Sequence, residues 1–243
     1  MTAGGDEVAH WARWHVDYTD PTSPLSQRLR VVISRIHQAV DLLPPGPISL
    51  ISACAGQGHD VVLALHHHPR AADVAGYLVE WDEHNVTQAT AALRAAGLHG
   101  ITAARADASE VDLYRDMPRA DLLLLCGIFG NVSDDDVENT IAHASSLCAP
   151  RAFVIWTRHR RAPDRTPRIR GWFGEAGFEE LSFESPGENY FSVGMHRLVS
   201  QPNFAKRIRP REGRDGAMPG PVAGALNGKI KADDPAGAKA VLD

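Results

Sequence analysis

Apolar residues recur at helical spacing through the first part of the chain. Ser23 is a favourable N-cap residue, and Pro24 suits the first helical position. The residues that follow every three or four positions are Leu25, Leu29, Val32, Ile33, Ile36 and Val40. This spacing predicts a helix that ends at the Pro-rich sequence 44–47, and residues 7–18 predict a shorter helix before it.

Beyond residue 47, short apolar stretches alternate with amphipathic ones. The apolar stretches predict seven strands, namely Ile48–Ala53, Gly76–Glu80, Ile101–Ala106, Asp121–Cys126, Ala152–Trp156, Phe178–Glu184 and Tyr190–Leu198. The order βαβαβαβαβαββ predicts a helix in every connection but the last. We therefore expect an α/β fold, with a mostly parallel, doubly wound, seven-stranded sheet. The closing strand pair predicts one antiparallel edge, and we expect the last strand to run antiparallel.

The composition divides the chain into three parts. The 243 residues carry a net charge of −5, but residues 202–243 hold eight Lys/Arg and five Asp/Glu. Nineteen of those 42 residues are Ala, Gly or Pro, so this segment has too little apolar surface to offset its ordering entropy. We expect an N-terminal helical segment over 1–45, one domain over 46–200, and a basic, disordered tail over 201–243.

Composition also argues against several classes of protein. Three cysteines are too few and too scattered for a disulfide framework or a zinc site, and no apolar run approaches the roughly 20 residues of a membrane span. No signal peptide is visible, so a cytoplasmic location is expected. The negative net charge gives no reason to expect a nucleic-acid partner. His66-His67-His68 does not predict a metal site, because successive helical side chains diverge by about 100°.

Residues suited to binding a nucleoside follow three successive predicted strands. The first strand runs into Cys54-Ala55-Gly56-Gln57-Gly58, where glycines allow a tight turn and a close approach of backbone to ligand. Glu80 ends the second strand, where a carboxylate can accept hydrogen bonds from a ribose diol. Asp107 follows the third strand, where it could accept from an adenine amine or cap the next helix. Ligands of doubly wound sheets bind at these strand ends.

The stretches SLISACAGQGHD, GYLVEWDEHN, ITAARADAS and ADLLLLCGIFGNVS together resemble the S-adenosylmethionine-dependent methyltransferases of the Rossmann-like class. The resemblance covers residues 25–199. It implies that the loop Cys54–Gly58 runs alongside the methionine and ribose parts of the cofactor. It also implies that Glu80 holds the ribose hydroxyls and that Cys126 and Gly127 lie beneath the sulfonium. The implied cofactor-binding residues are Ser52, Cys54, Ala55, Gly56, Gly58, Glu80, Trp81, Asp107, Ala108, Cys126 and Gly127.

The chain departs from the family pattern at two places. Ser52 and Cys54 stand where the family has an acid and a glycine, so a contact to the methionine amino group is lost unless Asp60 supplies it. The Asn/Asp-Pro-Pro-aromatic sequence of enzymes that methylate base or glutamine amines is absent after the fourth strand. We expect a small-molecule acceptor of unidentified chemistry.

Two other functional classes remain open at this stage. The Gly-x-Gly could belong to an NAD(P)-dependent oxidoreductase, although Val61 or Val62 stands where that fingerprint has its third glycine. The absent acid at Ser52 also allows a non-catalytic member of the fold that binds the cofactor or a protein partner.

Catalytic groups are harder to assign from the sequence. If methyl transfer needs a base, the candidates are His15, Tyr18 and His159. The aromatic segment Trp11–Asp20 either covers the acceptor as a lid or packs on the sheet. The basic run Arg158–Arg161 either holds an anionic group of the substrate or forms a solvated loop.

Overall fold

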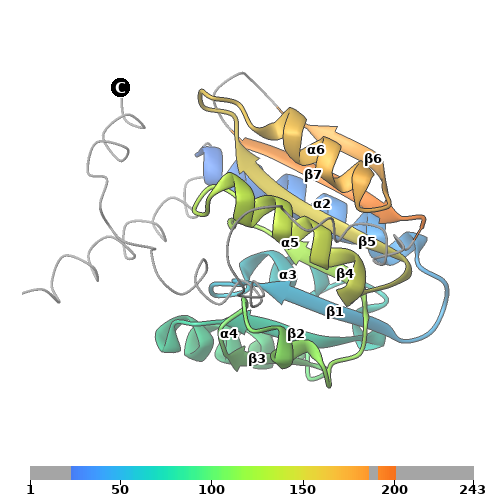
Figure 1. Ribbon diagram of the computed structural model, residues 1–243. Helices are drawn as coiled ribbons and strands as arrows, with labels where there is room; N and C mark the ends of the chain where they lie inside the picture. Colours follow the sequence, from blue (N-terminus) through green and yellow to red (C-terminus); the bar gives the residue numbers. More distant parts are fainter. Residues whose placement is uncertain (1–22, 186–190, 201–243) are drawn as a thin grey trace, which may run out of the picture.

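The computed structural model describes residues 23–185 and 191–200, which form one seven-stranded sheet flanked by helices (Figure 1). The predicted helix over 7–18 and the predicted tail lie outside these residues. The strands are β1 (Ile48–Ala53), β2 (Val74–Glu80), β3 (Ile101–Arg105), β4 (Ala120–Leu125), β5 (Cys148–His159), β6 (Phe178–Glu184) and β7 (Phe191–Leu198). The helices are α2 (Pro24–Leu42), α3 (His59–Leu65), α4 (Glu83–Ala95), α5 (Asp134–Leu147) and α6 (Thr166–Glu175). Two 3-10 turns, η1 (Ala71–Asp73) and η2 (Val111–Tyr114), complete the described elements.

The strand order β3-β2-β1-β4-β5-β7-β6 confirms the doubly wound sheet. Strands β1 to β5 are parallel, and β7 is antiparallel to both of its neighbours. The antiparallel last strand and the antiparallel edge of the sheet are therefore both confirmed. The edge belongs to β6, which follows the α6 crossover, and β7 fills the place between β5 and β6.

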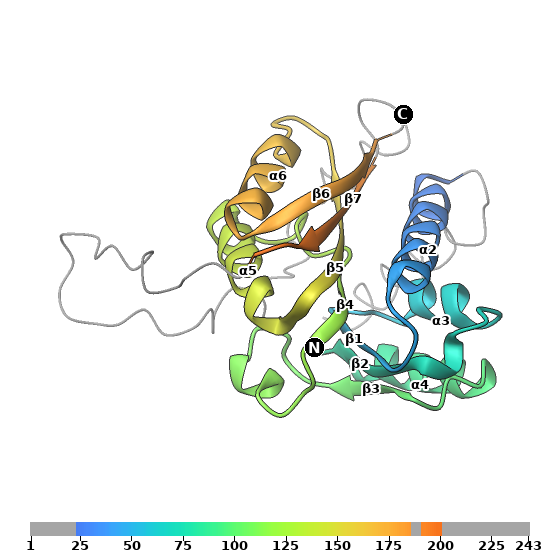
Figure 2. The ribbon, with the colours of Figure 1, turned by 90° about the vertical axis from the view of Figure 1, so that its right-hand side faces the viewer.

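Helices cover both faces of the sheet, with α2, α3 and α4 on one face and α5 and α6 on the other (Figure 2). The apolar strand β4 shows why two layers are needed. Its side chains alternate between faces, so Leu122 and Leu124 enter the core under α2 and α3, while Leu123 and Leu125 enter the core under α5 and α6. A strand that is apolar on both faces, as β4 is at all positions but Asp121, is buried on both faces.

The helix starts lie where the sequence predicts them. The hydroxyl of Ser23 accepts a hydrogen bond from the Ser26 N–H, and the carboxylate of Asp82 accepts one from the Asn85 N–H. Ser133 and Asp136 form the complete capping box at the start of α5. Each cap satisfies backbone donors that the first helical turn leaves unpaired.

One connection and the length of one strand differ from the predicted pattern. No α-helix joins β3 to β4, where the structure has only the 3-10 turn η2. Strand β5 is longer than Ala152–Trp156, because Cys148 pairs with Ala120 at one end and His159 pairs with Phe191 at the other. Strand pairing therefore extends into the basic run, whose first two residues belong to β5.

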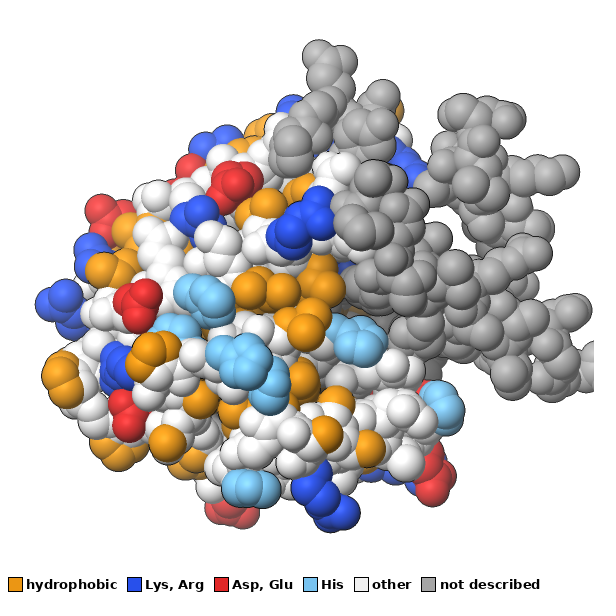
Figure 3. Space-filling view, turned by 180° about the vertical axis from the view of Figure 1, so that it is seen from behind, with side chains coloured by type: hydrophobic (Ala, Val, Ile, Leu, Met, Phe, Trp, Pro, Cys, Tyr) orange, Lys and Arg blue, Asp and Glu red, His pale blue; other side chains and the backbone are white. Residues whose placement is uncertain are grey.

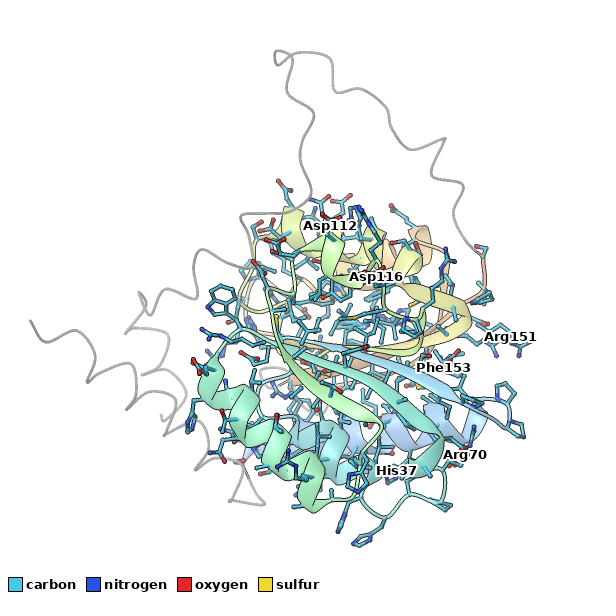
Figure 4. All side chains as sticks on the ribbon, turned by 90° about the horizontal axis from the view of Figure 1, so that it is seen from below. His37, Arg70, Asp112, Asp116, Arg151 and Phe153 are labelled. Carbon is cyan, nitrogen blue, oxygen red and sulfur yellow. The ribbon has the colours of Figure 1, made fainter. Side chains whose placement is uncertain are left out.

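Arg70, labelled in Figure 4, links the end of α2 to the approaches of β1 and β2. Its guanidinium donates hydrogen bonds to the carbonyl oxygens of Val40, Leu43, Pro44 and Gly46 and pairs with Asp73. These contacts satisfy carbonyls at the end of α2 and fix the Pro-rich turn to the approach of β2.

Among the described residues, no helix is long and apolar enough to cross a membrane.

Candidate functional site

The loop after β1 turns sharply at the carboxyl end of the sheet. Cys54, Gly56 and Gly58 have positive φ angles of 51°, 56° and 69°. Gly58 also lies so close to β2 that a Cβ atom would stand 2.6 Å from Cδ1 of Leu78. A side chain there would force the loop away from the sheet, which explains the glycine.

Glu80 ties this loop to the end of β2. Its Oε2 accepts a hydrogen bond of 2.7 Å from the Gly56 N–H, and its Oε1 accepts one of 2.9 Å from the Asp82 N–H. A carboxylate has about four acceptor positions, so both oxygens can still accept from a ligand. Glu80 thus holds the loop in shape and keeps acceptors for a diol.

Asp107 is a buried carboxylate with one oxygen left without a partner. It is 7% exposed, and its Oδ1 accepts hydrogen bonds from the N–H and the hydroxyl of Ser109 at 2.9 and 2.7 Å. Its Oδ2 has no hydrogen-bond partner in the structure. The alternative role as a helix cap is wrong, because η2 begins only at Val111. An unpaired buried carboxylate oxygen is costly unless a ligand donates to it.

Cys54 lies beside both carboxylates. Its side chain reaches solvent, yet protein surrounds the thiol closely enough that burial, reinforced by Glu80 and Asp107, raises its pKa to about 12. The thiol therefore stays protonated at neutral pH, which makes a nucleophilic role unfavourable. These interactions also show that the ends of β1, β2 and β3 bring their candidate residues together.

Tyr114 joins this group, and the sequence pattern did not predict it. Its hydroxyl donates a 2.8 Å hydrogen bond to the carbonyl oxygen of Ala108. Burial raises the pKa of the phenol, and Cys54 and Asp107 nearby raise it further. The available signal was the one aromatic residue in the connection between the third and fourth strands.

Asp60 occupies the other side of the loop, towards β4. It lies in the first turn of α3, where its Oδ1 accepts a 2.8 Å hydrogen bond from the Val61 N–H. Burial raises the pKa of this carboxyl group, and Arg28 of α2 opposes the change. Burial also raises the pKa of the Cys126 thiol, with Asp60 adding to the effect. Asp60, Arg28 and Cys126 are thus neighbours, whereas Ser52 is buried within β1.

Three other predicted residues keep surfaces available for a ligand. Trp81 follows Glu80 directly and is 61% exposed, which is unusual for so large an apolar side chain. Ala108 is partly buried beside Asp107. Gly127 donates a 2.8 Å hydrogen bond from its N–H to the hydroxyl of Thr157, so the end of β4 is fixed to β5.

A cavity of about 490 Å³ opens beyond Gly127, between the segments 132–135 and 158–165. His159 lines it and packs against Gly130. Burial lowers the pKa of His159, and Arg158 and Arg161 lower it further, so the ring is neutral at pH 7. Its Nδ1 lies 3.3 Å from the Arg161 N–H and accepts from it, which leaves Nε2 as a donor. This tautomer suits binding an acidic group better than removing a proton.

The remaining candidates fall into two groups. His15, Tyr18 and the segment Trp11–Asp20 lie outside the described residues. Several histidines gather on the face formed by α2 and α3, which is the face turned to the viewer in Figure 3. His66, His67 and His68 belong to this group. In the part of the chain that the structure describes, no three His, Cys, Asp or Glu side chains are placed to hold a metal ion.

A family model described as "Putative methyltransferase" matches residues 24–165. The chain belongs to this methyltransferase family. The match spans α2, β1 to β5 and the basic loop after β5, so it includes every strand end described above. No curated protein matches the methyltransferase.

Solved structures share the fold of the methyltransferase. The magnesium protoporphyrin IX methyltransferase of Synechocystis PCC 6803, with bound S-adenosylmethionine, is 18% identical, with a TM-score of 0.59 over 78% of this chain and 91% of that one. An O-methyltransferase family protein from Burkholderia thailandensis is 16% identical, with a TM-score of 0.55 over 71% of this chain and 57% of that one. The sheet with its antiparallel β7 is thus the Rossmann-like methyltransferase fold.

Proposed function

We propose that this methyltransferase transfers the methyl group of S-adenosylmethionine to a small-molecule acceptor. The observation that carries the proposal is the placement of two acceptor groups at adjacent strand ends. Glu80 keeps acceptor capacity beside the glycine loop, and Asp107 has a buried oxygen without a donor. An adenosine supplies the complementary donors, namely two ribose hydroxyls and one amino group.

The residues at the strand ends divide the cofactor between them. Glu80 accepts from the ribose hydroxyls, the exposed indole of Trp81 stacks on the adenine, and Oδ2 of Asp107 accepts from its amino group. The backbone of Cys54–Gly58 approaches the ligand closely because its glycines lack side chains. Asp60 takes the place of the acid that Ser52 lacks and faces the methionine ammonium group beside Cys126.

Positioning supplies most of the expected catalysis. The sulfonium of S-adenosylmethionine makes its methyl group electrophilic, so the chain has to align the acceptor with it and exclude water. Cys126 and Gly127 form the wall beneath the sulfonium, and the hydrogen bond from the Gly127 N–H to the Thr157 hydroxyl holds this wall in place. The assignment of His15, Tyr18 or His159 as a general base stays a prediction, tested by replacing each singly once an acceptor is known.

Calorimetric titrations with S-adenosylmethionine, S-adenosylhomocysteine and NADH test the proposal. We expect both adenosyl compounds to bind and NADH not to bind. Glu80→Ala should weaken S-adenosylhomocysteine binding at least about ten-fold, because it removes a charged acceptor. Glu83→Ala is the matched control, since Glu83 is exposed at the start of α4 and pairs only with Arg105 among the described residues. Binding of NADH in place of the adenosyl compounds would contradict the proposal.

One alternative rests on the residue at position 52. Ser52 stands where the family has an acidic residue. A second candidate function is therefore binding of the cofactor without transfer of its methyl group. Tight binding of S-adenosylhomocysteine without turnover across a broad acceptor screen would favour it. We also propose a reducing, cytoplasmic location without nucleic-acid partners, which the three free cysteines and the negative net charge support.

A further inference from the structure

The cavity beyond Gly127 has three arginines and a histidine among its lining residues. Arg158 and His159 end β5, and Arg161 and Arg165 follow in the loop that leads to α6. The opposite wall is the start of α5 with Asp134 and Asp135. A volume of about 490 Å³ lies within the range of small-molecule sites, roughly 300–1,000 Å³.

Arg158 is the group in this cavity that most needs a ligand. Its Nε is buried and has no hydrogen-bond partner, and its guanidinium forms no ion pair with any described residue. Burial lowers its pKa, but an arginine stays charged. Asp134 and Asp164 are near enough to favour its charged form, but neither forms an ion pair with it, and a ligand carboxylate would supply two acceptors matched to the guanidinium.

The neighbouring charges leave the cavity positive overall. Arg165 pairs with Asp134 at 3.2 Å, and Arg160 is directed away to Asp164 and Ser185. Arg161 is exposed, as is Asp135, and His159 is neutral with its Nε2 hydrogen available to donate. Three arginines and two aspartates line the cavity, and Asp134 also pairs with Arg168 at 3.3 Å, so the cavity carries a net positive charge. A net positive charge suits an anionic group, and the planar guanidinium of Arg158 matches the two oxygens of a carboxylate.

The cavity also lies next to the proposed methyl-transfer site. Thr157 precedes Arg158 in β5 and accepts the hydrogen bond from Gly127, the residue proposed to lie beneath the sulfonium. His159 lies beside Gly130 in the same connection, where a Cβ atom on Gly130 would be in ordinary van der Waals contact with the imidazole ring. A small acceptor held at Arg158 would therefore lie at the wall that the two sites share.

We propose that the cavity binds a carboxylate of the methyl acceptor through Arg158, with Arg161 and the Nε2–H of His159 as further donors. The acceptor is thus a small carboxylic acid. This inference rests on the proposed function, because it treats the cavity as the acceptor side of a methyltransferase. It assigns Arg158 to substrate binding and leaves the methylated atom to the acceptor.

Benzoate and its uncharged isostere benzamide test the proposal, each titrated into the full chain saturated with S-adenosylhomocysteine. We expect benzoate to bind at least about ten-fold more tightly than benzamide, since one charged pairing is removed in the amide. Arg158→Gln should abolish this preference. Arg151→Gln, which alters an exposed arginine at the far end of the same strand (Figure 4), should keep it.

The outcomes separate this proposal from the proposed function. Equal or absent binding of benzoate and benzamide, in a protein that binds S-adenosylhomocysteine, overturns the acidic acceptor and leaves the methyltransferase intact. Failure to bind S-adenosylhomocysteine overturns the proposed function instead. Tighter binding of phenyl phosphate than of benzoate overturns the choice of a carboxylate. If Arg158→Gln does not fold, Arg161→Gln provides the test, with a smaller expected loss of preference.

Discussion

At the scale of single residues, the most informative atom is Oδ2 of Asp107. Ser109 donates two hydrogen bonds to Oδ1 and so fixes the orientation of the carboxyl group. The second oxygen is thereby left buried and available. A group oriented in this way recognises a hydrogen-bond donor, because only an acceptor faces the ligand.

Asp107→Asn should reverse this preference. The two donors of Ser109 hold the amide oxygen, so the amide nitrogen would take the place of Oδ2 and face the adenine amino group, donor against donor. We expect S-adenosylhomocysteine to bind about 10- to 100-fold more weakly. S-inosylhomocysteine, which carries a carbonyl at that position, should bind the variant better than the wild type, as measured by calorimetry. An equal loss of both ligands would contradict the proposed adenine contact.

A second residue-scale prediction concerns His196, which is 1% exposed in β7. Its Nδ1 accepts a 3.2 Å hydrogen bond from Nε1 of Trp156, and burial lowers its pKa to about 4 even though Glu180 opposes the shift. The unfolded chain has a histidine pKa near 6.5, so it binds the proton more readily than the folded protein. Stability from neutral His196 is complete above about pH 6.5 and is lost as the pH falls towards 4.

Urea denaturation at pH 7 and pH 4.5 measures this effect. Between these values His196 should account for a loss of roughly 2 kcal/mol of unfolding free energy. His196→Gln should be less stable than the wild type at pH 7 but should lose less stability on acidification. His143→Gln, which changes an exposed histidine of α5, is the control and should follow the wild type. The same pH dependence in His196→Gln as in the wild type would rule out this role.

Sequence patterns found the residues that lie at strand ends, but not those brought in by packing. Glu80 and Asp107 could be predicted because the end of a strand fixes their place in a parallel sheet. Tyr114 could not, since nothing in a short 3-10 turn indicates where its side chain points. The grouping of Asp60 with Arg28 depends on how α2 packs beside α3, which local spacing does not encode.

At the scale of elements, the pairing of β5 with β7 depends on one glycine. Gly194 stands opposite Trp156, and a Cβ atom there would lie 2.3 Å from the indole ring. The indole is fully buried among the rings of Phe129, Phe173 and Phe183. The strand therefore leaves a gap in its own side-chain row that the tryptophan fills.

Gly194→Ala should destabilise the protein by about 2–3 kcal/mol, because the added methyl group overpacks a rigid aromatic core. Gly171→Ala is the control, since Gly171 lies within α6 with no atoms near its would-be Cβ, and it should stabilise the helix by roughly 0.5–1 kcal/mol. Chemical denaturation measures both changes. The combination with Trp156→Phe should recover part of the Gly194→Ala loss, and additive effects would show that the two residues do not conflict.

Element boundaries were predictable where caps and turns mark them, and less so elsewhere. Ser23, Asp82 and Ser133 fixed three helix starts correctly. The length of β5 was underestimated, because its last residues are polar and are held in the strand by pairing with β7 rather than by burial. The internal place of β7 also depends on pairing between distant strands, which an apolar pattern alone does not specify.

At the scale of the whole molecule, the last strand that the structure describes ends at Leu198. We predict that one domain over 46–200, with the preceding helix α2, contains the cofactor site. A chain that lacks residues 202–243 should then bind S-adenosylhomocysteine within about two-fold of the full chain, as measured by calorimetry. Its midpoint of thermal unfolding should be unchanged. Weaker binding by a folded truncation would place part of the site in the deleted segment.

The position of β7 also determines when the protein can complete its fold during synthesis. Trp156 is made 40 residues before His196, its hydrogen-bond partner in β7. Until β7 has been synthesised, β5 and β6 both have unpaired strand edges, and the indole of Trp156 is not covered by β7 at Gly194. Such edges pair readily with other chains. A nascent chain that stalls after β6 therefore exposes strand edges that favour aggregation.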